Sequence, residues 1–136
     1  MPRAPADSLP PSLDDLDRLA REAWAGLPEA FRAMAGDVII RIQDFAEDEL
    51  LDDMEIEDPL ELTGLYSGRD LTQKSIMDPT PQAPMVFLYR HAILYEWITH
   101  GDVALSDLVA HVLVHEIGHH FGLSDEQMDA LLEEAD

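Results

Sequence analysis

The chain has 136 residues, of which 29 are acidic and 8 are basic, so its formal net charge at pH 7 is −21. This charge excludes a broad basic face for a phosphate backbone and repels an anionic membrane surface, so neither nucleic acid nor a membrane is expected as a partner. The absence of cysteine excludes disulfides, thiolate metal sites and a cysteine nucleophile.

The N-terminal segment is predicted to lie outside the folded core. Residues 1–11 contain four prolines, which is typical of a disordered arm, and residues 12–136 are expected to form one domain. The segment has a single arginine and no apolar stretch, so it does not resemble a secretory signal. No run of the chain approaches the roughly 18 apolar residues of a membrane-spanning helix. We therefore expect a soluble, cytoplasmic protein.

Two helices are predicted to open the domain. Ser12 and Asp15 have the spacing of a capping box, and apolar residues recur at helical spacing after them, which predicts a helix over roughly 13–25. A second, shorter helix is predicted over roughly 28–35, with a proline in its first turn and a glycine after its end.

The middle of the chain is predicted to supply the strands. They are expected at roughly 37–43, 62–67 and 85–89. Nine acidic residues lie between positions 44 and 58, and we interpret this segment as a solvated loop or a frayed helix rather than a cation site, because like charges repel one another. Residues 91–99 are ambiguous but favour a helix.

The last third of the chain is predicted to form two helices. Asp102 can cap a helix over about 103–121, and Gly122 can adopt the left-handed conformation that stops it. Ser124 then begins a second capping box, which predicts a terminal helix over roughly 125–134.

The first of these two helices carries an H-E-x-x-H motif. His115 and His119 are four residues apart, so both imidazoles can reach one ion at about 2.0–2.1 Å. Glu116 lies about 100° around the helix from His115, where it can take a proton from a metal-activated water. Asp125 follows the turn and can deliver a third ligand; its alternative role is to complement the dipole of the last helix, in which case Glu126 is the substitute ligand. Two histidines, one carboxylate and an open position are typical of a catalytic zinc site.

The opposite side of this helix carries an apolar stripe that is expected to face the core, which directs the histidines toward a cleft. The stripe consists of Ala110, Leu113, Val114, Ile117 and Phe121. Tyr66 or Tyr89 could polarise a substrate carbonyl, although a half-buried strand tyrosine is the simpler interpretation.

The other histidines are assigned supporting or structural roles. His111 precedes His115 by four residues and could pair with it, but no carboxylate is placed to complete that alternative, so we interpret it as a core residue or a support beside the site. His120 lies about 140° around the helix from His115 and is expected to be a polar surface or supporting group. His91 and His100 are expected to be structural.

Residues 115–125 resemble the H-E-x-x-H-x-x-G-x-x-D form of the metzincin-type signature. The chain as a whole, over roughly residues 13–135, resembles the small bacterial zincin-like metallopeptidases. The matching stretches are 27–31, 38–42, 62–68, 87–90 and 114–125.

This resemblance implies a compact α+β domain, with a mixed β-sheet of about three to four strands packed on helices and the active-site helix near the C-terminus. It implies His115, His119 and Asp125 as metal ligands and Glu116 as the general base. One feature departs from the larger metzincins, which carry a methionine turn well beyond the third ligand. Only 11 residues follow Asp125 here, and Met128 lies inside the predicted terminal helix.

The sequence thus predicts a zinc-dependent peptidase with one Zn²⁺ per chain, acting on a peptide or protein substrate that lies along an edge strand at 62–67. Three alternatives stay open. Two histidines and an aspartate also match the facial triad of Fe(II) oxygenases, which gives Glu116 no role. A metal-dependent ribonuclease is disfavoured by the charge. The third alternative is a metal-stabilised binding or regulatory module with latent or no peptidase activity.

Overall fold

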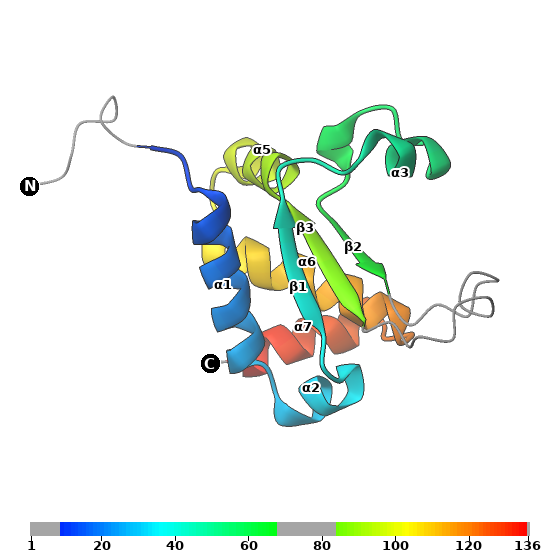
Figure 1. Cartoon of the computed structure of the whole chain (residues 1–136). Coiled ribbons are helices and arrows are strands. Elements are labelled where there is room, and N and C mark those ends of the chain that lie inside the picture. The colour runs from blue at the N-terminus through cyan, green and yellow to red at the C-terminus, as the bar shows by residue number, and fades with distance from the viewer. Residues whose placement is uncertain (1–8, 68–83, 136) are drawn as a thin grey trace, which may run out of the picture.

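The computed structural model describes residues 9–67 and 84–135, and shows a small mixed sheet packed on helices (Figure 1). In chain order its elements are α1 (Leu13–Gly26), α2 (Glu29–Ala35), β1 (Ile39–Gln43), α3 (Asp48–Asp53), the 3₁₀ turn η2 (Pro59–Glu61), β2 (Gly64–Ser67), β3 (Met85–Tyr89), α5 (Arg90–His100), α6 (Leu105–His120) and α7 (Asp125–Glu134). The predicted α+β class is confirmed.

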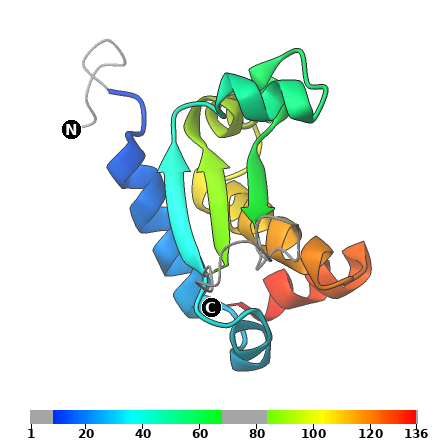
Figure 2. The same ribbon diagram turned by 45° about the vertical axis from the view of Figure 1, so that its right-hand side comes forward.

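The described sheet has the order β1-β3-β2. β1 pairs with β3 in parallel and β2 pairs with β3 antiparallel, as the arrowheads in Figure 2 show. β3 is therefore central, and β2 lies at an edge of the sheet.

The main core lies between one face of this sheet and the helices α1 and α6. Alternate residues of the strands point into it, as the two-residue period of a strand requires: Ile40, Val86 and Leu88 are buried. Helix α1 adds Leu16 and Ala20 from its apolar stripe. In Figures 1 and 2, α6 runs behind β3 and β2, so the helix that carries the H-E-x-x-H motif is held against the sheet.

The opposite face of the sheet contributes to a second, smaller cluster. It contains Ala46, Leu51, Leu62, Tyr89 and Ala92, which come from the acidic segment, the end of η2, β3 and α5. The acidic segment forms the short helix α3, which turns Leu51 inward while its carboxylates stay in solvent. The predicted solvation of this segment is confirmed by the exposure of its acidic residues, and part of it forms a defined helix.

The predicted elements are found close to their expected positions. Both capping boxes form: Ser12 pairs with Asp15 at the start of α1, and Ser124 pairs with Gln127 at the start of α7. The ambiguous segment is the helix α5. Part of the predicted N-terminal arm, residues 1–8, lies outside the described residues.

The predicted cap of α6 is wrong. Its N-cap is Ala104 rather than Asp102, and the helix begins at Leu105. The chain bends at Asp102 and Val103, and the indole Nε1 of Trp97 donates a hydrogen bond to the carbonyl of Val103 at 2.8 Å. The helix therefore begins two residues later than the capping signal at Asp102 indicates.

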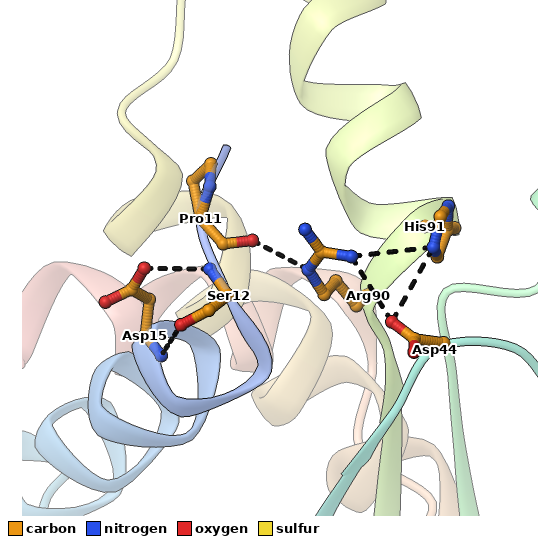
Figure 3. A network of polar contacts seen from close by, with 6 residues as sticks. All are labelled: Pro11, Ser12, Asp15, Asp44, Arg90 and His91. Atoms are coloured by element: carbon orange, nitrogen blue, oxygen red, sulfur yellow. Dashed lines mark hydrogen bonds and ion pairs between the residues drawn. The ribbon is translucent and has the colours of Figure 1, made fainter. Parts of the chain in front are cut away.

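A polar junction joins the N-terminal end of α1 to the start of α5 (Figure 3). The Arg90 guanidinium donates from Nε to the carbonyl of Pro11 at 2.7 Å and from Nη1 to Asp44 at 3.3 Å. His91 lies 3.6 Å from the same carboxylate and stacks on the ring of Phe45. This agrees with the structural role expected for His91.

Among the described residues, no helix is long and apolar enough to cross a membrane.

Candidate metal centre

Three histidines lie on one face of α6. His111, His115 and His119 follow one another at four-residue intervals, so each lies about one turn from the next. The opposite face is buried as predicted at Leu113, Val114 and Ile117, but Phe121 lies just past the end of the helix and is 38% exposed.

The turn after α6 brings α7 back along this histidine face. Gly122 has a φ of +76°, as predicted, which is a left-handed conformation that glycine adopts without a steric penalty. Ser124 caps α7, and Asp125 is the first residue of that helix. A sharp turn and a capped helix therefore place Asp125 opposite the histidines.

Gly118 and Met128 set the distance between the two helices. Met128 is fully buried, and a Cβ built on Gly118 would overlap its Sδ. Only a glycine lets this methionine pack so closely against the helix. The platform beside the histidines is therefore a methionine inside α7, in agreement with its predicted position in the terminal helix.

The donor atoms of His115, His119 and Asp125 converge. The carboxylate Oδ1 of Asp125 lies 3.5 Å from Nε2 of His119 and 3.9 Å from Nδ1 of His115. One donor atom from each of the three lies within 4.8 Å of the others. Donors bound at 2.0–2.1 Å to one tetrahedral ion lie about 3.3 Å apart, so small side-chain movements would bring all three within bonding distance.

The chemistry of this donor set fits zinc. Two imidazoles and a carboxylate are ligands that Zn²⁺ commonly takes, and together they leave one position open. The Asp125 side chain is 78% exposed and that of His119 is 58% exposed, so the set faces solvent on one side. His115 lies deeper, at 17% exposed, and its Nε2 atom is buried without a hydrogen-bond partner. The substitute ligand Glu126 belongs to neither cluster of donors found among the described residues.

Glu116 lies beside this set, between α6 and the edge strand β2. Burial raises the pKa of its carboxyl group, while His119 and the backbone N–H of Tyr66 act to lower it. The contact with β2 depends on Gly64, because a Cβ there would lie 2.9 Å from Val112 Cγ1 and 3.1 Å from Glu116 Cγ. Gly64 thus allows β2 to approach the carboxylate of Glu116. The sequence analysis did not predict this contact.

The prediction that no carboxylate is placed to complete the pair of His111 and His115 is wrong. Its donor atom lies within 4.8 Å of those of His115 and Asp129, so a carboxylate does complete this alternative set. Asp129 is one helical turn after Asp125 on α7, and its Oδ1 lies 3.6 Å from Nε2 of His115. The repeated four-residue spacing on both helices was the signal that could have revealed it. Burial and the neighbouring His115 lower the pKa of His111.

The remaining candidate side chains lie around this centre. His120 is exposed, as predicted, and packs against the ring of Tyr66 with 4.3 Å between ring centroids. Tyr89 is 2% exposed inside the smaller cluster, where burial, with Glu47 and Glu116, raises its pKa to about 12. A tyrosine so enclosed packs as a core residue, while Tyr66 stays partly exposed on the edge strand.

The comparisons with known proteins identify a family for this chain. No curated protein matches the chain. Residues 35–134, which include every residue of the centre, match the family described as zincin-like metallopeptidase. The family implies zinc binding and a hydrolytic activity in general terms. The chain belongs to the zincin-like metallopeptidase family.

Proposed function

We propose that this protein is a zinc-dependent peptidase in which His115, His119 and Asp125 hold the metal and Glu116 is the general base. The observation that carries the proposal is the convergence of these three donors next to the partly buried carboxylate of Glu116. When bound, zinc supplies polarisation of the substrate carbonyl and lowers the pKa of water.

The role of Glu116 follows from its surroundings. A general base works best when its pKa lies near the working pH, and burial shifts the pKa of this carboxyl group in that direction. Glu116 accepts a proton from the attacking water and returns it to the leaving amine. A purely structural metal site has no use for a partly buried carboxylate in this position, so Glu116 favours the enzyme over a binding or regulatory module.

The substrate is proposed to be an extended peptide bound along β2. This strand lies at an edge of the described sheet, so its outer backbone groups can pair with an added strand. The close approach at Gly64 places that edge beside Glu116. A peptide paired there would lie next to the base and to the donors on α6.

The test compares wild type with Glu116→Gln in two measurements. Metal analysis is expected to find about one zinc per chain in both proteins, because the substitution leaves the three donors intact. Digestion of a peptide library is expected to slow by about 10²–10⁴-fold in Glu116→Gln. Equal cleavage by both proteins would contradict the assignment of the base, and a zinc-free wild type would contradict the metal centre.

A further inference from the structure

Helices α6 and α7 repeat the same donor pattern one turn apart. The first set is His115, His119 and Asp125, and the second is His111, His115 and Asp129. The two aspartates are four residues apart on α7, as the histidines are on α6, and the helices run in opposite directions. The second set is therefore the first set displaced by one turn, with His115 common to both.

His115 presents a different nitrogen to each set. Its Nδ1 lies 3.9 Å from Oδ1 of Asp125, while its Nε2 lies 3.6 Å from Oδ1 of Asp129. The nitrogen on the Asp129 side is the buried atom without a hydrogen-bond partner. A separation of 3.6 Å is too long for a hydrogen bond but close to the spacing of two ligands on one ion.

A cavity lined in part by acidic side chains lies beside the second set of donors. A cavity of about 700 Å³ opens beside His111, and its lining includes Glu22, Glu96, Asp107 and Glu133. Their negative potential concentrates cations near the entrance. His111 is the member of the donor set that lines this cavity, so the cavity adjoins the second set on its His111 side.

We propose that His111, His115 and Asp129 form a second site for a divalent transition-metal ion such as Zn²⁺ or Co²⁺, and that it competes with the first site for His115. Two imidazoles and a carboxylate suit such ions. A neutral imidazole has one lone pair for a metal, so His115 ligates one ion at a time. On the proposed peptidase function, an ion in the second site removes His115 from the first and leaves that chain inactive.

The experiment separates the two sites by substitution and measures metal binding rather than catalysis. The metal-free proteins are wild type, His119→Ala/Asp125→Ala, His111→Ala/Asp129→Ala, and the variant with all four changes. Each is titrated with Zn²⁺ against a chromophoric chelator, and with Co²⁺ to follow its visible absorption. The substituted side chains of His119, Asp125 and Asp129 are all more than half exposed, so the fold should tolerate them. His119→Gln/Asp125→Asn provides a milder version of the key variant.

Each double variant is expected to bind one ion per chain at least about 100-fold more tightly than the fourfold variant, since even residues that only support ligands are worth about 10–100-fold. Wild type is expected to bind one ion per chain, because His115 is shared. Binding by His119→Ala/Asp125→Ala and by its milder version that is no tighter than in the fourfold variant would overturn the second site. Two ions per wild-type chain would overturn the competition. Neither result depends on peptidase activity, so a failure of the proposed function would be seen separately in the digestion assay.

Discussion

The Arg90 junction and the α6–α7 metal centre both bring polar groups together, the first from distant parts of the chain and the second from two consecutive helices. The two regions also differ in the kind of atom that they bring together. At the junction a hydrogen-bond donor meets hydrogen-bond acceptors: the Arg90 guanidinium donates to the Pro11 carbonyl and to the Asp44 carboxylate (Figure 3). At the metal centre the atoms that converge are possible metal ligands, and Nε2 of His115 is buried without a hydrogen-bond partner. A set of polar groups that satisfy one another stabilises the fold, whereas a set of ligand atoms facing one another indicates a binding site.

The largest expected effect is on metal binding at the centre. His115→Ala removes the residue shared by both donor sets, so zinc affinity is expected to fall by more than about 100-fold. Titration of the metal-free protein measures this loss. His91→Ala is the matched control, because His91 is also partly exposed and lies near a carboxylate, but at the junction. An equal loss of affinity in the control would remove the distinction between the two regions.

Gly118→Ala tests how the helices of the centre are held together. The added Cβ would overlap Sδ of Met128, so the free energy of unfolding is expected to fall by about 3 kcal/mol, as in other overpacked cores. Chemical denaturation measures the change. Met128→Ala removes the Sδ atom that the new Cβ would overlap. Gly118→Ala should therefore cost less stability in the Met128→Ala background than in wild type. Simple addition of the two losses would show that the close contact does not set the helix separation.

Arg90→Ala tests whether the junction stabilises the fold without affecting metal binding. It leaves the Pro11 carbonyl and the Asp44 carboxylate without their donor, so the free energy of unfolding is expected to fall by about 2 kcal/mol. Zinc affinity should stay the same. Arg21→Ala is the control, because its ion pair with Asp17 is exposed and worth less than about 0.5 kcal/mol. A loss of metal binding in Arg90→Ala would mean that the regions are coupled.

Tyr89 links the two regions and gives the smallest effect. It precedes Arg90 in the chain, and burial, with Glu47 and Glu116, raises its pKa to about 12 in the folded state. Above pH 10 the unfolded chain releases this proton while the folded chain keeps it, so stability should fall as the pH rises from about 10 to 12.

Denaturation at pH 9 and pH 11 measures this dependence. We expect wild type to lose about 1 kcal/mol more than Tyr89→Phe between the two values. Tyr95→Phe, at an exposed tyrosine, should behave like wild type. If wild type and Tyr89→Phe lost the same stability between pH 9 and pH 11, the raised pKa of Tyr89 would not be the cause of the loss.

The sequence by itself determined the local parts of this protein. Both capping boxes, the left-handed turn at Gly122 and the helical spacing of His115 and His119 were predictable, because each depends on residues within about one helical turn. The position of Asp125 opposite those histidines followed from the same short segment. The metal ligands and the base remain assignments that the proposed experiments test.

Only the tertiary structure decided which elements meet. Asp129 completes a set with His111 because α7 packs antiparallel on α6, at a distance that Gly118 and Met128 allow. The approach of Gly64 to Glu116 likewise arises from a contact between distant segments. Such contacts depend on how side chains from different segments pack together, and the spacing of residues along the chain does not specify that packing.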